Sequence, residues 1–321
     1  MKTTKLRLSL LATLCLSAIT FYSCSSDDSP AVEELVDSIS YTYSDVTKVL
    51  DFRPAPGQFV NELPKYEEGD TQEIMNQKAL KAISGNKLSM VSLGGFGGYI
   101  VMGFDQTIKN IDGRRDFIVL GNAFKNSSEP GIIMVAYDKN KNGKPDEDEW
   151  YEIKGSEYSN AKTIHNYEMT FYKPSADLDA KKGDFDNYIE YKNNQGDKGY
   201  KPKNRFHNQS YYPLWIKETS LTFKGAKLPN NATDTSGKGA NWILPEYEYG
   251  YADNQVNSHI DAAIDVNWAV DKNGKFVQLP GVDFIKVYTA MDQEAGWLGE
   301  TSTEVSGVID LHKAKFKVPT R

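Results

Sequence analysis

The sequence predicts a mainly β protein, an antiparallel β-sandwich of jelly-roll type with long loops. Three observations support this fold class. Most apolar and aromatic residues occur in runs of a strand's length, the segments between these runs are rich in glycine, asparagine and aspartate, and only one stretch has the periodicity of a helix. Short strands joined by such turns are typical of sandwiches, whereas parallel sheets need a helix between successive strands.

Residues 1–23 have the composition of a bacterial signal peptide, with three basic residues before a short apolar run over residues 8–16. That run is too short to span a bilayer, which takes about 20 residues. The motif Phe21-Tyr-Ser-Cys24 resembles a lipobox, so we expect Cys24 to carry the lipid in the mature protein. Residues 24–40 are rich in serine and acidic residues and are predicted to form a flexible tether.

The composition restricts the location and the partners of the chain. A net charge of −7, a pI near 5.3 and the lack of a basic stripe argue against nucleic-acid binding. The two cysteines, Cys15 and Cys24, leave none for a disulfide in the mature chain. Asp27 and Asp28 resemble the acidic export signal of Bacteroidetes lipoproteins, so we expect an outer-membrane, lipid-anchored protein exposed on the cell surface.

The one convincing helix is predicted N-terminal to the strands, over Thr71–Ile83. Asp70 is the expected N-cap, Glu73 follows three residues later as in a capping box, and Gly85 is the expected stop. The helix carries one apolar stripe, formed by Met75, Ala79, Leu80 and Ile83.

Residues 41–321 are expected to form a single β-sandwich domain, because a sandwich with large loops accommodates this length. Short apolar runs bounded by turn residues mark the expected strands. These runs are 88–93, 99–104, 116–120, 132–137, 150–153, 167–172, 221–223, 264–270 and 284–290.

A large insertion without regular structure is expected over about residues 183–251, a polar segment that nevertheless contains many aromatic residues. Disordered segments are poor in aromatics, so these side chains are expected to pack or to bind. Four of them are the leading candidates for stacking on a ligand, namely Tyr211, Tyr212, Trp215 and Trp242. The alternative is that they hold long loops on the sandwich.

Residues 138–149 have the spacing of an EF-hand calcium loop, with glycine at its sixth position. The flanking runs have the pattern of strands and Pro145 stands at position 8, so we expect a lone loop between two strands. Calcium is the expected cofactor, held by oxygens of Asp138, Asn140, Asn142, Lys144 (through its carbonyl), Asp146 and Glu149. The alternative is a solvated acidic hairpin.

Catalytic motifs are absent from the sequence. The four histidines are scattered, without a His-Glu-x-x-His pair or a nucleophile elbow. A glycosidase needs two carboxyl groups across a cleft, and the candidates are Glu129, Glu157, Glu300 and Glu304. A further group of oxygen ligands, in which a second calcium site and solvated turns remain open, comprises Asp253, Asn254, Asp261 and Asp265.

Several motifs resemble a family of cell surface proteins of gut Bacteroidetes, over most of the mature chain. They include Gly98-Tyr-Ile-Val-Met, Gly121-Asn-Ala-Phe124, Ser128-Glu-Pro130, Gly155-Ser-Glu157 and Gly296-Trp-Leu-Gly-Glu300. The resemblance implies a jelly-roll-like surface lipoprotein of a kind that often accompanies TonB-dependent uptake systems, including corrinoid (cobalamin) loci.

The expected function is therefore to bind or present a small ligand, a corrinoid or a glycan, to an outer-membrane transporter. Two alternatives remain, a calcium-dependent carbohydrate-active hydrolase and a structural or adhesive surface protein. Fold alone does not choose among them, because sandwiches serve all three purposes.

Overall fold

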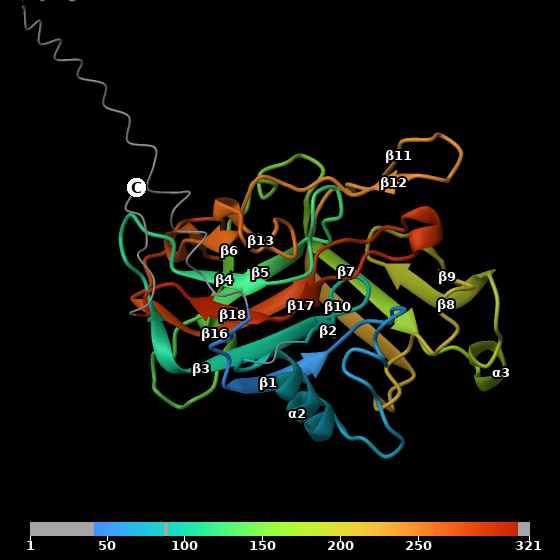
Figure 1. Ribbon diagram of the computed structural model, residues 1–321, viewed down its shortest axis with the longest axis horizontal. Helices are drawn as coiled ribbons and strands as arrows, with labels where there is room; N and C mark the ends of the chain where they lie inside the picture. Colours follow the sequence, from blue (N-terminus) through green and yellow to red (C-terminus); the bar gives the residue numbers. More distant parts are fainter. Residues whose placement is uncertain (1–41, 87–88, 314–321) are drawn as a thin grey trace, which may run out of the picture.

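The computed structural model describes residues 42–86 and 89–313 (Figure 1). The predicted signal peptide 1–23, the lipidation site Cys24, the tether 24–40 and the first residue of the expected domain lie outside the described residues. Within the described part of the chain, no helix is long and apolar enough to cross a membrane.

The predicted mainly β, antiparallel fold is confirmed. Its largest sheet has seven strands in the order β1-β3-β16-β5-β6-β15, with β13 pairing on β5. These strands span Lys48–Arg53 (β1), Tyr99–Lys109 (β3), Gly281–Thr289 (β16), Gly131–Ala136 (β5), Trp150–Ile153 (β6), Ala269–Val270 (β15) and Tyr251–Ala252 (β13).

A four-stranded sheet, β10-β7-β8-β9, lies to the right of the larger sheet in Figure 1. Three smaller sheets are β14-β4-β18, β17-β2 and the hairpin β11-β12, which projects at the top. Their strands span Ser220–Lys227 (β10), Ile164–Tyr172 (β7), Phe185–Asn193 (β8), Lys198–Lys203 (β9), Ala263–Ile264 (β14), Phe117–Leu120 (β4), Gly307–Asp310 (β18), Glu304–Val305 (β17), Val91–Ser92 (β2), Thr233–Asp234 (β11) and Trp242–Ile243 (β12).

The two faces of the seven-stranded sheet have different roles, because side chains alternate along a strand. On one face Ile100, Val287 and Ile133 lie side by side across β3, β16 and β5, and all three are completely buried in the main core. The neighbouring row, on the opposite face, contains Lys286 and Met134. This second face is only partly covered, which leaves room for a cleft.

Helix α2 (Gln72–Ile83) confirms the predicted helix and packs below β1 in Figure 1. Its cap differs from the prediction, because Thr71 Oγ1 accepts the hydrogen bond from the Ile74 N–H. Asp70 instead pairs with Lys78 at 2.6 Å. A second, four-residue helix that the sequence did not indicate is α3 (Ala176–Asp179), and short 3₁₀ turns are η1 (Glu147–Glu149), η2 (Ile260–Ala262), η3 (Val266–Trp268) and η4 (Gly296–Leu298).

Two segments depart from the expected strand pattern. Residues 264–270 form two short strands instead of one, because Asp265 accepts a hydrogen bond from the Asn267 N–H and begins η3. Residues 183–251 contain the hairpin β8–β9, which the sequence did not indicate, and strand β10, of which only residues 221–223 were expected as a strand. In β8 the adjacent Tyr188 and Ile189 are both buried, next to a shift in register, so the alternation that marks a strand is broken.

Candidate ligand-binding cleft

A cleft with a volume of about 430 Å³ opens beside turn η4. Its rim contains two exposed aromatic side chains, Phe206 and Trp297, which are 66% and 54% accessible to solvent. Its floor contains three carboxylic acids, Glu129, Glu300 and Glu304. We call this site the acidic cleft.

A glycine in turn η4, Gly296, allows the rim of the cleft to pack against the β11–β12 hairpin. Gly296 has a φ of 58°, and a Cβ there would lie 2.2 Å from the indole nitrogen of Trp242. The next aromatic residue, Trp297, donates a hydrogen bond from Nε1 to the Ala240 carbonyl at 3.3 Å. The β11–β12 hairpin therefore supports the wall of the cleft, and only glycine at position 296 lets the two segments approach so closely.

The floor is built around a buried carboxylate, Asp253. Its oxygens accept backbone N–H groups from Asn122 at 2.8 Å, Ala123 at 2.9 Å and Glu304 at 3.0 Å. Gly121 is required beside it, because a Cβ there would lie 2.4 Å from Asp253 Oδ1. Three segments that are distant in sequence are therefore joined by this one side chain.

Glu129, Asp253 and Glu304 each offer an oxygen, and these oxygens lie within 4.8 Å of one another. The Ser302 N–H donates to Glu129 at 3.1 Å, and the Ser302 hydroxyl donates to Glu304 at 3.0 Å. The donor set is all oxygen, which suits a hard divalent cation such as calcium. Hydroxyl groups of a ligand could equally bind here.

Burial in this floor changes the protonation of the acids. Burial, followed by the nearby charge of Asp253, raises the pKa of Glu129 to about 8. Burial also raises the pKa of Glu304 and of Glu300 well above the usual value for a glutamate, and other carboxylates add to both shifts. At neutral pH the floor therefore retains protons, so it can donate as well as accept hydrogen bonds.

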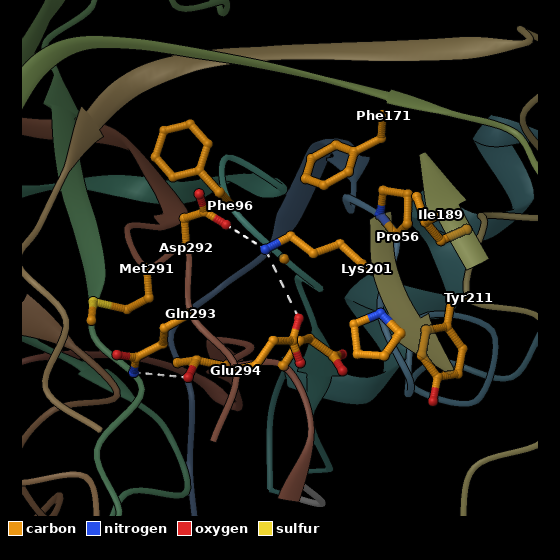
Figure 2. A pocket seen from close by; sticks show the side chains of 14 residues that line it. Pro56, Phe96, Phe171, Ile189, Lys201, Tyr211, Met291, Asp292, Gln293 and Glu294 are labelled. Atoms are coloured by element: carbon orange, nitrogen blue, oxygen red, sulfur yellow. Dashed lines mark hydrogen bonds and ion pairs between the residues drawn. The ribbon is translucent and has the colours of Figure 1, made fainter. Parts of the chain in front are cut away.

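Figure 2 shows a small cavity that lies beside the acidic cleft. The two share the lining residues Glu300 and Thr301. The small cavity's volume of about 20 Å³ is enough for a single water molecule. In Figure 2 the Lys201 ammonium points between Asp292, at 2.6 Å, and Glu294, at 3.9 Å. Lys201 thus neutralises a second pair of acids.

The predicted ligand residues are mostly in the interior. Tyr211 lines the small cavity and is 4% exposed, and Tyr212 is 1% exposed with its hydroxyl donating to the Glu218 carbonyl. Trp215 is 7% exposed and stacks on Phe52 at 5.9 Å between ring centroids. Their positions correspond to the alternative role, which is to hold loops on the sandwich.

Trp242 is the exception, because it is partly exposed and lies against Gly296 at the wall of the acidic cleft. The exposed aromatic residues of the cleft, Phe206 and Trp297, are not among the predicted ligand residues. Phe206 belongs to the aromatic segment and Trp297 to a family-like motif, but neither pattern reveals which ring is exposed.

Of the four glutamates considered for catalysis, the structure brings Glu129, Glu300 and Glu304 into one cleft. Glu157 lies elsewhere, where its carboxylate accepts a hydrogen bond from Asn160 at 2.7 Å. Three of the four residues considered for a second calcium site have partners outside the cleft floor. The Asn254 side chain makes two hydrogen bonds with the backbone of Tyr247. Asp261 lies 3.8 Å from Arg115, and Asp265 caps η3.

The predicted calcium loop connects β5 to β6, so the expected flanking strands are confirmed. The Asp138 carboxylate accepts the N–H groups of Asn142 at 3.0 Å and Gly143 at 2.8 Å, and Gly143 has a φ of 76°. The loop therefore folds back over its first residue, as six or more oxygen ligands from a short segment require.

The other expected calcium ligands of the loop also lie close to one another. Asp146 Oδ2 accepts the side-chain amides of Asn140 at 2.6 Å and Asn142 at 2.9 Å. Glu149 is 2% exposed, and its oxygens accept the N–H groups of Lys139 and Asp146. The residues fit calcium in type and position, but the two asparagine amides would have to turn so that oxygen faces the ion.

Comparisons with protein-family models and with curated proteins find no match to this chain. The acidic cleft is the strongest candidate for a ligand site, because exposed aromatic rings and buried acids converge there from segments that are far apart in the sequence.

Proposed function

We propose that this chain is a non-catalytic surface lipoprotein that captures a small polyhydroxylated ligand in the acidic cleft. The observation that supports this most directly is the pairing of an aromatic rim, Phe206 and Trp297, with a floor of glutamates, among which burial raises the pKa of Glu129 to about 8. A volume of about 430 Å³ lies within the range of small-molecule sites.

The ligand class follows from the chemistry of the rim and floor. Aromatic faces stack on the apolar faces of sugar rings, and a protonated carboxyl group both donates to and accepts from hydroxyl groups. A glycan fits both requirements. A corrinoid, which has a flat apolar macrocycle and amide groups, is the second ligand class to be tested.

Calcium is proposed as a structural ion in the loop 138–149. An exposed loop with three acidic ligands, Asp138, Asp146 and Glu149, belongs with the weak extracellular sites, whose Kd is roughly 10⁻⁴ to 10⁻³ M. Such an ion stabilises the connection between β5 and β6 in a chain whose mature part lacks disulfides.

The location of the protein in the cell is proposed from the signal peptide and the residues that follow it. The lipobox-like motif that ends at Cys24, followed by Asp27 and Asp28, supports a lipid anchor on the outer face of the outer membrane. A captured ligand would then be passed to a TonB-dependent transporter, the partner that the family resemblance implies.

Hydrolysis is the second candidate function, and one observation favours it. Glu129 and Glu304 lie close together in an open cleft, and Glu129 has a pKa of about 8, as a general acid requires. Retaining glycosidases place their two carboxyl groups about 5–5.5 Å apart. Product formation would establish hydrolysis.

The test is isothermal titration of the mature domain, with calcium present, against neutral glycans and cyanocobalamin. Replacement of Trp297 by alanine should lower the affinity for the captured ligand at least about tenfold, because a stacking surface is lost. The melting temperature should change little, since Trp297 is 54% exposed and its side chain donates a single hydrogen bond, to the Ala240 carbonyl. Product analysis of the same mixtures distinguishes capture from hydrolysis.

The matched control is Phe276→Ala, which removes another aromatic ring of similar exposure, 58%, outside the cleft. Equal losses in both variants would contradict a site at the acidic cleft. No binding and no product across the panel would favour the structural or adhesive protein instead.

A further inference from the structure

A second and larger cleft, with a volume of about 710 Å³, lies between the seven-stranded sheet and the strands β7 and β10. Its floor is the partly covered face of β16, β5 and β6, and its walls include residues of β7, β10 and the turn after β15. We call it the inter-sheet cleft. It shares no lining residue with the acidic cleft.

The floor is defined by strand register. Lys286 of β16 pairs with Met134 of β5, and Met134 pairs with Glu152 of β6. The three side chains therefore point in the same direction from adjacent strands. Two strand spacings separate Lys286 from Glu152, which places their backbones about 10 Å apart with an apolar side chain between them.

The two charged groups on this floor have no hydrogen-bond partner within the described residues. Lys286 has its ammonium over the ring of Tyr99, 4.2 Å from the centroid, and Glu152 contacts no basic group. Burial raises the pKa of Glu152 to about 7 and lowers the pKa of Lys286. Half-buried polar groups without partners are costly, so their position in an open cleft points to a ligand that supplies partners.

The junction of the two sheets is tightly built. The Ala226 N–H donates to the hydroxyl of Tyr288 at 2.9 Å, and a Cβ on Gly225 would lie 2.7 Å from the Tyr288 ring. On the wall, Lys224 and Glu168 pair with each other at 2.7 Å. This pair of wall charges is thus satisfied, in contrast to the two charges on the floor.

Aromatic side chains complete the site. Trp150 follows the calcium loop and lines the cleft, as do Tyr158 and His165, whose rings lie 4.5 Å apart. Flat apolar surfaces next to an acid and an ammonium group match a ring that carries both hydroxyl groups and a carboxylate.

We propose that the inter-sheet cleft is a second ligand site, distinct from the acidic cleft, and that it binds an acidic sugar. The carboxylate of a uronic acid residue pairs with Lys286, a hydroxyl group bonds Glu152, and the sugar ring lies over Met134 against the aromatic wall. The cationic anchor is the feature that the acidic cleft lacks, so the two sites select different glycans.

The probes are a galacturonic acid disaccharide and its neutral galactose analogue, titrated calorimetrically into the mature domain with calcium. Wild type should bind the acidic disaccharide at least about tenfold more tightly than the neutral one, a factor of ten being about 1.4 kcal/mol. Lys286→Met should remove this preference. Glu152→Leu should lower the affinity for the acidic disaccharide by a similar factor.

Three controls keep the result specific. Lys162→Met removes one positive charge from an exposed position outside the cleft, and Trp297→Ala alters the acidic cleft; both should bind the acidic probe as wild type does. Lys286→Arg keeps the charge and should retain the preference. Melting curves verify folding, and if Lys286→Met fails to fold, Glu152→Leu and Lys286→Arg decide the matter.

The proposal is overturned if wild type shows no preference for the acidic disaccharide. It is also overturned if folded Lys286→Met and Glu152→Leu both bind that probe as wild type does, or if Trp297→Ala abolishes its binding. The last result would assign acidic sugars to the acidic cleft. If Trp297→Ala instead loses only the binding of neutral glycans and still binds the acidic disaccharide, the two sites bind their ligands independently.

Discussion

Single residues decide the shape of both clefts, and glycine positions show this most clearly. Gly296 has positive φ and lies against Trp242, and Gly225 lies against Tyr288. At each position the absence of a side chain allows two segments to touch. Gly296 belongs to a motif that is visible in the sequence, but the ring that each of the two glycines accommodates comes from a distant part of the chain.

Gly296→Ala is expected to lower stability by about 1–3 kcal/mol, because a Cβ would combine left-handed strain with a collision at the Trp242 indole. Turn η4 should shift and ligand affinity at the acidic cleft should fall. Thermal melting and titration with the captured ligand measure the two effects. The control is Gly239→Ala, which has a φ of 76° but no atom within 4 Å of the new Cβ, so it carries the strain without the collision.

At the level of elements, the loop between β5 and β6 is the clearest example of a local pattern. Its turn residues, its glycine and its buried Glu149 all lie within one short segment, so their spacing is visible in the amino-acid sequence itself. Strands β8 and β9 are the opposite case. A shift in register places two adjacent side chains of β8 in the core, and this is set by contact with the rest of the sheet.

Calcium at about 10 mM should raise the melting temperature relative to EDTA. Binding to the folded state alone adds RT ln(1 + [L]/Kd), which is about 1.4–2.7 kcal/mol for the expected affinity and corresponds to roughly 2–5 °C. Glu149→Ala should abolish the shift. Asp148→Ala, a neighbouring acid that is not among the expected ligands, should leave it intact, and equal melting of wild type with calcium and with EDTA would exclude a calcium site.

For the whole molecule, the buried acids dominate the dependence of stability on pH. Burial raises the pKa of Glu129 to about 8 and those of Glu152 and Glu294 to about 7, above their value near 4.5 in the unfolded chain. Between these values the folded state binds more protons than the unfolded state. Stability therefore falls as pH rises from about 5 to about 8.

We expect the melting temperature, measured with EDTA to exclude metal binding, to be at least about 3 °C higher at pH 5.5 than at pH 8. Glu152→Gln mimics the protonated acid and should reduce this difference by stabilising the protein at pH 8. Glu168→Gln is the control, because this acid is paired with Lys224 on the surface. A melting temperature that rises with pH over this range would contradict the predicted protonation of the buried acids.

The sequence by itself determined the fold class, the helix at 72–83, most long strands and the path of the loop 138–149. These features depend on periodicity, caps and turn residues, which act between neighbours in the chain. The tertiary structure alone decided which aromatics are exposed and which acids meet. The Ser302 N–H bonds Glu129 across 173 residues, and Glu152 faces the same cleft as Lys286, because sheet pairing and register, rather than local spacing, bring these groups together.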